Sequence, residues 1–332
     1  MKAMVLDQTG PAEERLLNLR NMPAPRPGHG QVVVAVEACG VCRTDLHLVE
    51  GEISAPLPLI LGHQVAGRIV ELGGGVATLR EGDLVGVGWL HSTCGECSFC
   101  RSGRENLCPN ARFTGRDIAG GYAERLLADA RFVYKLPSQF EAVDAAPLLC
   151  AGIIGFRALR LSEIKPGGRL GLFGFGASAH LAIQVALHWG CEVYAFSREE
   201  HHRRLARDLG AVWAGAAGDD PGIQLNAAVI FAPAGELIPQ ALARLDRGAT
   251  LAVNAIHMSP IPSFDYGLLY HERTVRSVAS YTRRDAEEFI ALAAEIPVRA
   301  DIERYTLEDA NKALLRVKRG EVHGAAVIHV HR

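Results

Sequence analysis

The chain has 332 residues, of which 48% are hydrophobic and 22% charged, and its net charge is −2. This composition is typical of a globular protein long enough for two domains. The slightly negative net charge argues against binding to nucleic acid or to an anionic membrane, because both require a basic surface. The N-terminus has no signal-peptide core and no apolar run approaches the roughly 18–20 residues of a membrane span, so we expect a cytoplasmic protein.

Short segments rich in Val and Ile, separated by glycine and proline turns, fill the chain up to about residue 150. Strands are expected at 31–37, 64–72 and 83–87. This pattern predicts a β-rich, barrel-like domain.

A closely spaced set of thiols lies within this first part, at Cys94, Cys97, Cys100 and Cys108. Disulfides are rare in the reducing cytosol and a chain of this length does not need them, so one metal ion explains the spacing better. Zinc bound by four thiolates has a closed shell with no position for substrate. We therefore predict a structural zinc here and expect the chemistry to lie elsewhere.

The pattern changes to alternating strands and helices between about residues 152 and 283. Strands are expected at 169–173, 192–196, 212–213, 228–232, 250–254 and 274–278, with helices such as 179–189 and 199–209 between them. Short strands separated by helices predict a doubly wound parallel sheet in an α/β fold.

The last part of the chain carries expected helices at 285–294 and 307–319 and an apolar strand at 325–330. A single strand must pair with a sheet, so we assign this tail to the first domain. The predicted domains are residues 1–151, completed by 284–332, and residues 152–283.

A glycine-rich turn follows the strand expected at 169–173. Gly174 and Gly176, with small residues at Ala177, Ser178 and Ala179, lie where a dinucleotide pyrophosphate would meet a helix N-terminus. The first glycine permits the turn and the second lets phosphate approach the backbone. A glycine-rich turn in another kind of α/β fold is the alternative.

The end of the next strand distinguishes the two nicotinamide cofactors. NAD-binding folds carry Asp or Glu about 20 residues after the glycine turn, to hold the ribose diol. This chain has Ser197 and Arg198 there, and a guanidinium is suited to a 2′-phosphate. The feature favours NADP, with NAD possible, unless Arg198 is a surface residue neutralised by Glu199 or Glu200.

Taken together, these motifs resemble the zinc-dependent alcohol dehydrogenases of the medium-chain dehydrogenase/reductase superfamily. The run CGVCRTDLH at 39–47, GHQ at 62–64, the four-cysteine loop, LCAG at 149–152 and the glycine turn follow the family's order and spacing. The resemblance covers essentially the whole chain. It implies a GroES-like β-rich catalytic domain built from both ends of the chain, with a Rossmann domain between them.

The resemblance also implies a second, catalytic zinc, bound by Cys42, His63 and Cys150. Three protein ligands leave a fourth position for water or substrate, as a catalytic zinc site requires. Alternatively, both cysteines would be small buried hydrophobes and His63 a hydrogen-bonded turn residue. Each alternative is plausible alone, but together they explain the pattern poorly.

Supporting roles follow from the same resemblance. Thr44 would accept the proton of the substrate hydroxyl and pass it towards His47, which exchanges it with solvent. Asp45 would hydrogen-bond the second nitrogen of His63, and Arg43 would contact the cofactor pyrophosphate. The alternatives are a turn-capping threonine and aspartate, and two exposed basic side chains without a role.

One position departs from the family. Many members carry glutamate after the ligand histidine, whereas this chain has Gln64, which removes one negative charge near the metal without removing a ligand. Trp89 resembles an aromatic residue that narrows the substrate pocket in several relatives, which would favour small alcohols and aldehydes, unless it only packs in the core.

The sequence thus predicts an oxidoreductase with two zinc ions per chain that acts on a small alcohol or aldehyde, as a dimer or tetramer. One alternative is a zinc-free quinone or enoyl reductase of the same superfamily, against which the ligand set argues. Another is a non-enzymatic zinc protein, against which the dinucleotide turn and the near-neutral charge argue.

Overall fold

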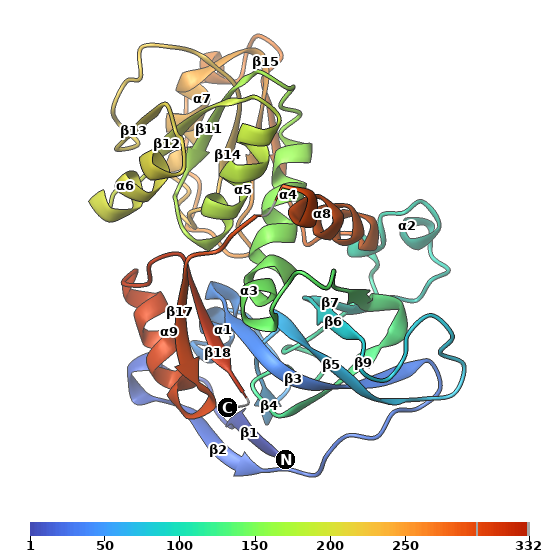
Figure 1. The fold of residues 1–332 in the computed structure, drawn as a ribbon. Coiled ribbons are helices and arrows are strands. Elements are labelled where there is room, and N and C mark those ends of the chain that lie inside the picture. The colour runs from blue at the N-terminus through green and yellow to red at the C-terminus, as the bar shows by residue number, and fades with distance from the viewer. Residues whose placement is uncertain (297, 331–332) are drawn as a thin grey trace. The chain divides into compact units, whose positions relative to one another are not determined.

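The computed structural model describes residues 1–296 and 298–330, and the chain forms two compact units (Figure 1). The first contains Met1–Ile153, Ser280–Glu295 and the chain from Arg299 onward, and the second contains Ile154–Ala279 with Ile296 and Val298. The sequence placed the boundaries after residues 151 and 283. Residues 280–283 belong to the first unit because Tyr281 accepts a hydrogen bond from the Leu90 amide (3.3 Å) and the Arg283 amide donates to Glu105 (2.9 Å).

The first unit is β-rich, as its sequence predicted. Its largest sheet has the order β10-β6-β5-β3-β18-β17, and β9 also pairs with β3. Two smaller sheets have the orders β2-β1-β4 and β7-β8. The strands are β1 Lys2–Leu6, β2 Leu17–Asn21, β3 Gln31–Val41, β4 Leu59–Ile60, β5 Val65–Leu72, β6 Leu84–Val87, β7 Leu90–Ser92, β8 Arg112–Phe113, β9 Arg125–Asp129, β10 Val133–Lys135, β17 Ile302–Thr306 and β18 Ala325–His329.

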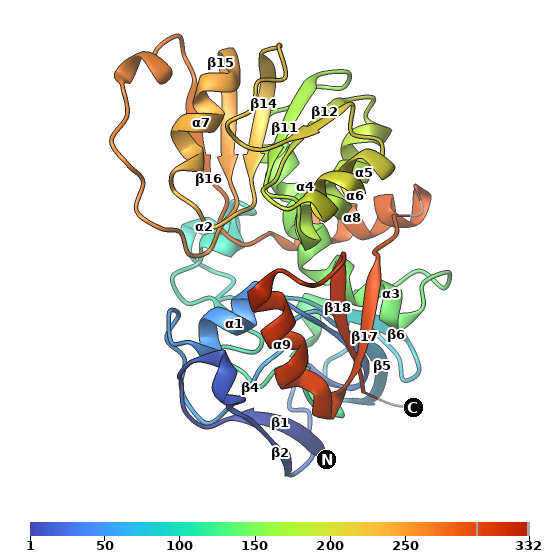
Figure 2. The same cartoon turned by 90° about the vertical axis from the view of Figure 1, so that its left-hand side faces the viewer.

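Helices of this unit border its sheets. They are α1 Arg43–Val49, α2 Ser98–Arg101, α3 Ala142–Ala145, α8 Arg283–Glu295 and α9 Ala310–Arg319, while α4 Ala151–Leu161 crosses the unit boundary. Figure 2 shows α9 beside α1 and β18. β18 pairs antiparallel with β3, with Ile328 opposite Cys39, so the chain's last strand lies against the segment that leads to Cys42.

The second unit is a doubly wound sheet. Its strands have the order β13-β12-β11-β14-β15-β16, and every pair is parallel. This is the Rossmann order, which confirms the predicted fold class. The strands are β11 Arg169–Phe173, β12 Glu192–Phe196, β13 Trp213–Gly215, β14 Leu225–Ile230, β15 Leu245–Val253 and β16 Thr274–Ser277, and the helices are α5 Ala177–His188, α6 Glu200–Asp208 and α7 Leu237–Arg244.

Apolar side chains from neighbouring strands form the core of the second unit. Phe173 and Phe196 stack with ring centroids 4.2 Å apart, and the central strands β11 and β14 are buried along most of their length. Such continuous burial is typical of parallel strands covered on both faces. The core holds β11 and β12 in parallel register. In this fold a dinucleotide binds at the carboxyl ends of these strands.

One apolar stretch contradicts the sequence expectation about membrane spans. By length and composition Ala142–Leu161 is apolar enough to cross a membrane. However, 78% of its most apolar window is buried inside the protein. It is therefore a core segment, since core helices pass the same test of length and hydropathy.

Candidate active site and metal centres

Three side chains from separate parts of the first unit meet in one cluster. Cys42 precedes α1, His63 lies in the loop between β4 and β5, and Cys150 immediately precedes α4. Their ligand atoms all lie within 4.8 Å of one another. The structure thus brings together the three residues that the resemblance implied as ligands. The position before His63 requires glycine, because Gly62 has a φ of +95° and a Cβ added to it would lie 2.5 Å from the Tyr122 ring.

The His63 imidazole is oriented for an additional ligand. The residue is fully buried, and its Nδ1 lies 3.1 Å from Oδ1 of Asp45. Its Nε2 is buried and has no hydrogen-bond partner among the described residues. A buried polar nitrogen without a partner is costly, and two thiols beside it complete a donor set that zinc prefers. The residues therefore fit a zinc ion with three protein ligands.

Asp45 organises this cluster through four hydrogen bonds. Its carboxylate accepts from the Cys42 amide (2.8 Å), the Tyr122 hydroxyl (3.1 Å), the Gly62 amide (3.3 Å) and His63 Nδ1. The side chain is fully buried, so these bonds replace its hydration. Tyr122 was not identified from the sequence, because a single tyrosine carries no spacing signal.

Burial, charges and hydrogen bonds within the cluster shift the pKa values of its members. Burial lowers the pKa of His63, but the charge and hydrogen bond of Asp45 and the contact with Cys42 outweigh it and raise the pKa to about 10. The hydrogen bond from Cys150 lowers the pKa of Cys42 well below its usual value, against the effect of burial. The same hydrogen bond and burial raise the pKa of Cys150. Zinc binds neutral histidine and cysteine thiolate, so it would compete with protons at these three residues.

Thr44 and His47 lie three residues apart on α1, and so on the same face of the helix. Thr44 lies beside the cluster, since Sγ of Cys42 donates to its hydroxyl oxygen over 3.7 Å. His47 is buried, with 6% of its surface exposed, and its Nδ1 contacts Oε2 of Glu52. The alternative of an exposed His47 is therefore wrong. Arg43 is exposed, and its Nη2 donates to the carbonyl oxygen of Val317 in α9 (3.1 Å).

The four-cysteine loop forms a second cluster around α2. All four sulfur atoms lie within 4.8 Å of one another, with Cys94 and Cys108 3.5 Å apart and Cys97 and Cys100 3.6 Å apart. Amides of Glu96 and Cys97 lower the pKa of Cys94 to about 6, whereas burial raises the pKa of Cys108 to about 11. Four thiols at such separations fit a closed zinc shell.

The glycine turn of the second unit lies between β11 and α5. Gly174 has a φ of +86°, and a Cβ there would lie 2.8 Å from the Ala232 amide nitrogen, so the turn requires glycine. A Cβ on Gly176 would meet nothing within 4 Å, which leaves the backbone open on that side. Gly176 caps α5, whose first turn includes Ala177 and Ser178 and presents amide groups to an anion.

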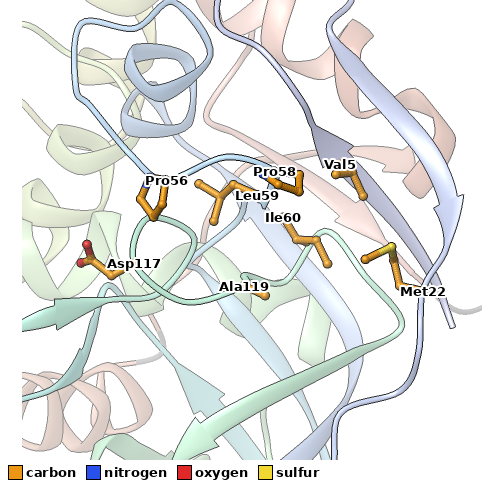
Figure 3. Close-up of a pocket in the computed structure, with 8 residues that line it drawn as sticks. All are labelled: Val5, Met22, Pro56, Pro58, Leu59, Ile60, Asp117 and Ala119. Atoms are coloured by element: carbon orange, nitrogen blue, oxygen red, sulfur yellow. The ribbon is translucent and has the colours of Figure 1, made fainter.

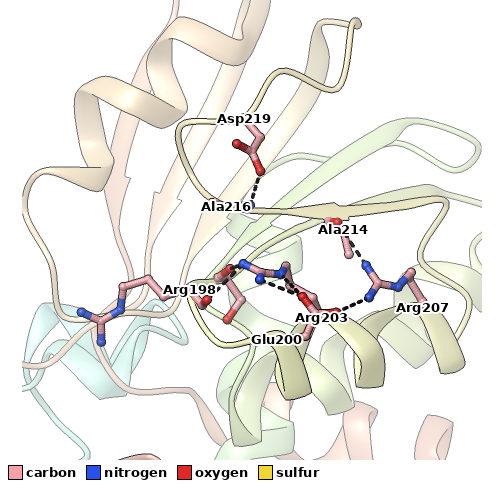
Figure 4. Close-up of polar contacts among 8 residues, drawn as sticks. Arg198, Glu200, Arg203, Arg207, Ala214, Ala216 and Asp219 are labelled. Carbon is pink, nitrogen blue, oxygen red and sulfur yellow. Dashed lines mark hydrogen bonds and ion pairs between the residues drawn. The ribbon is translucent and has the colours of Figure 1, made fainter.

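The end of β12 places Ser197 and Arg198 next to α6. Glu200 forms ion pairs of 2.7 Å with both Arg203 and Arg207, and Arg203 Nη1 donates to the carbonyl oxygens of Ser197 (2.9 Å) and Arg198 (3.0 Å). Figure 4 shows the Arg198 side chain extending away from these contacts. Glu200 is thus occupied by other arginines and does not neutralise Arg198.

Trp89 lies against the first cluster. It is 7% exposed, contacts the His63 ring edge to face with centroids 4.8 Å apart, and stacks on Phe113 at 5.0 Å. It therefore packs in the core and contacts a candidate ligand. Gln64 is also buried, and its side chain lies against Gly40 of β3. A Cβ added to Gly40 would lie 3.0 Å from the Cβ of Gln64.

A separate cavity in the first unit contains none of these residues. It has a volume of about 220 Å³ and is shown in Figure 3. It is lined by Val5, Met22, Pro56, Pro58, Leu59, Ile60, Asp117 and Ala119. Because Asp117 already accepts a hydrogen bond from the Phe113 amide and pairs with Arg116, the cavity offers little polar chemistry to a ligand.

Comparison with known proteins gives matches over the whole chain. Residues 28–138 match the alcohol dehydrogenase GroES-like domain, and residues 177–295 match the zinc-binding dehydrogenase domain. A Mycobacterium tuberculosis (strain CDC 1551 / Oshkosh) protein named "Probable alcohol dehydrogenase AdhA" is 45% identical, covering 99% of this chain and 97% of the relative.

Solved structures agree with these matches. A cinnamyl alcohol dehydrogenase from Sorghum bicolor has a TM-score of 0.91 at 28% identity, covering 99% of this chain and 97% of its own. The acetophenone reductase of Geotrichum candidum, solved in complex with NAD, has a TM-score of 0.87 at 27% identity, with coverage of 99% and 96%. The similarity therefore extends over both units.

Proposed function

This chain belongs to the zinc-dependent alcohol dehydrogenase family of the medium-chain dehydrogenase/reductase superfamily, and we propose that it oxidises a small alcohol to its aldehyde, or reduces the aldehyde, with NADP(H). The observation that carries the proposal is the cluster of Cys42, Cys150 and the partnerless Nε2 of His63. A donor set of three leaves one position for substrate.

Two zinc ions per chain would have separate roles. Cys42, His63 and Cys150 would hold the catalytic ion, and the four-cysteine loop the structural one. When bound, the catalytic zinc would supply a Lewis acid to the substrate oxygen, and the nicotinamide would supply or accept the hydride. Asp45 accepts the hydrogen bond from Nδ1 of His63, which would leave Nε2 to bind the metal.

The proton of the substrate hydroxyl requires its own path. Thr44 lies beside Cys42 and would accept that proton, and His47 lies on the same helix face to carry it onward. The buried Trp89 against His63 favours a small or unbranched substrate, because its ring occupies space next to a ligand.

For the cofactor we propose that Arg198 selects NADP over NAD. It has no carboxylate neighbour at position 197, its side chain extends away from the Glu200 pairs, and no ion pair of Arg198 is found among the described residues (Figure 4). A charge-assisted hydrogen bond contributes about 1.5–3 kcal/mol, so one bond to the 2′-phosphate favours NADPH by about tenfold or more. Gly174, Gly176, Ala177 and Ser178 would receive the pyrophosphate.

The test is a panel of small alcohols and aldehydes, assayed with both cofactors on protein of known zinc content. We expect turnover with NADPH above NADH, loss of turnover when a chelator removes zinc, and two zinc ions per chain. Turnover that persists without zinc would instead favour the quinone or enoyl reductase alternative, and no nicotinamide binding would favour a non-enzymatic zinc protein. The cytoplasmic location and the homo-oligomeric state stay predictions.

A further inference from the structure

A buried carboxylate joins the four-cysteine loop to the start of α8. Glu105 lies between Cys100 and Cys108 and is 4% exposed. Its carbonyl oxygen accepts a hydrogen bond from the Cys108 amide (3.0 Å), and its Oε1 accepts from the amide (2.9 Å) and Nε (3.4 Å) of Arg283. Glu105 therefore contacts a candidate zinc ligand through its backbone and the first residue of α8 through its side chain.

The chain before α8 is fixed by a helix cap. The amide and the hydroxyl of Thr282 both donate to Oδ2 of Asp285 (2.9 and 2.7 Å), and the Asp285 amide donates back to the Thr282 hydroxyl (3.1 Å). Such a reciprocal cap holds the entry of the chain into the helix. Because the cap fixes the backbone between Tyr281 and Arg283, a displacement of Arg283 is passed on to Tyr281.

The Tyr281 side chain reaches the strand next to Trp89. Tyr281 is 1% exposed, and its hydroxyl oxygen accepts a hydrogen bond from the Leu90 amide at the start of β7 (3.3 Å). Trp89 directly precedes Leu90, and its ring contacts the ring of His63. The Tyr281 hydroxyl therefore holds the backbone beside an aromatic residue that packs on a candidate ligand.

The same hydroxyl lies beside the segment that leads to Cys150. A Cβ added to Gly88 would collide with the hydroxyl oxygen of Tyr281 and would lie 2.6 Å from the carbonyl oxygen of Leu149. Both oxygen atoms therefore pack against one backbone position that has no room for a side chain. Leu149 is fully buried and directly precedes Cys150. A shift of Tyr281 would therefore also move a second candidate ligand.

We propose that Glu105 and Tyr281 couple the two metal sites, so that the ordered four-cysteine loop holds the ligands of the catalytic metal in place. The path runs from the loop through Glu105 and Arg283 to Tyr281, and continuous networks of packed and hydrogen-bonded groups carry such coupling. Both are positioning residues, because they act on the ligands only through other groups. The inference rests on the proposed function, because it concerns the two metal sites that this function requires.

Cadmium-113 NMR measures the two sites separately in protein that is loaded with cadmium in place of zinc. A site of four thiolates and a site of two thiolates and one imidazole give different signals, because the chemical shift depends on the number of thiolate ligands. The Cys150→Ser variant identifies the signal of the three-ligand site. Stepwise addition of a chelator then gives the relative affinity of each site from the loss of its signal, without any measurement of activity.

Glu105→Ala and Tyr281→Phe should each lower the cadmium affinity of the three-ligand site about tenfold, the lower end of the 10–100-fold range for groups that support metal ligands. Tyr281→Phe should leave the four-thiolate site unchanged, because the hydroxyl bonds to Leu90, outside the loop. Glu105→Gln keeps an acceptor oxygen for Arg283 and should restore most of the affinity. The double variant should lose about tenfold rather than a hundredfold, because both substitutions break the same path.

Two further substitutions are matched controls. Glu96→Ala removes an exposed carboxylate from the same loop. Tyr134→Phe removes another buried hydroxyl of the first unit, one that has no hydrogen-bond partner among the described residues. Both variants should bind cadmium at the two sites with wild-type affinity.

The outcomes separate the inference from the proposed function. Wild-type affinity at the three-ligand site in Tyr281→Phe or in Glu105→Ala, or a hundredfold loss in the double variant, would overturn the coupling alone. A wild type with a single cadmium site would overturn the two-metal arrangement and the inference with it. Two coupled sites in a wild type that turns over no alcohol with either cofactor would overturn the proposed function alone. If Glu105→Ala unfolds, Glu105→Asp replaces it, because the shorter side chain keeps the charge and does not reach the Arg283 amide.

Discussion

Replacing Asp45 by Asn measures how strongly one buried carboxylate organises the ligand cluster. Each carboxylate oxygen accepts two hydrogen bonds: Oδ1 from His63 Nδ1 and the Gly62 amide, and Oδ2 from the Cys42 amide and the Tyr122 hydroxyl. An amide side chain has only one acceptor oxygen, so in either orientation two of these donors face an NH₂ group. Hydrogen bonds to a charged group contribute about 1.5–3 kcal/mol each, so the substitution should lower the free energy of unfolding by roughly 3–6 kcal/mol.

Urea unfolding and zinc content after dialysis are the assays. Loss of a carboxylate behind a ligand histidine typically weakens metal binding about 10–100-fold, so Asp45→Asn should also retain less zinc. Tyr122→Phe is the matched control, because it removes one of the four donors and leaves the carboxylate, which should cost about 1.5–3 kcal/mol and leave zinc binding nearly intact. An Asp45→Asn variant with the unfolding midpoint and zinc content of the wild type would refute this reasoning.

Further substitutions test the other sites. Cys97→Ser should lower the thermal unfolding midpoint, because it removes a ligand of the structural zinc. Cys150→Ser should abolish turnover and leave the circular dichroism spectrum unchanged. Elemental analysis that finds only one zinc ion per wild-type chain would contradict the two separate zinc sites on which both predictions depend. Ser197→Asp should reverse the cofactor preference, because a carboxylate binds the ribose diol and repels the 2′-phosphate, and unchanged kcat/KM ratios for NADPH and NADH would count against it. Gly174→Ala should destabilise the protein by about 1–3 kcal/mol, because its φ is +86° and Cβ would meet Ala232, and an unshifted urea midpoint would exclude this.

Regular strands of the second unit could be predicted closely from the sequence. β11 Arg169–Phe173 and β12 Glu192–Phe196 have the predicted bounds, because a strand buried on both faces is an apolar run that ends at polar or turn residues. β17 Ile302–Thr306 was missed, because it contains Glu303 and Arg304 and is buried only in part. Its identity as a strand depends on pairing with β18, which is a tertiary contact.

The candidate ligands could be predicted for a different reason. Cys42, His63 and Cys150 were predicted as ligands through the family resemblance, whose motifs occur in this chain in the same order, and the structure brings the three residues together. Tyr122 and Glu52 could not be found in this way, because many residues supply a hydroxyl or a carboxylate. Only the folded chain shows which of them lies against Asp45 or His47.

The spacing of the motif at 42–47 follows from helix geometry as much as from metal chemistry. Cys42 is the N-cap of α1, and Asp45, three positions later, returns its side chain to the Cys42 amide, which is the geometry of a helix-capping carboxylate. The same carboxylate reaches His63 because the cap holds it at the helix N-terminus. Thr44 and His47 then lie one turn apart on one face. A shift of Asp45 by one position would therefore remove the cap and the contact with His63 together, so the stability of α1 and the orientation of the candidate ligand depend on the same bonds.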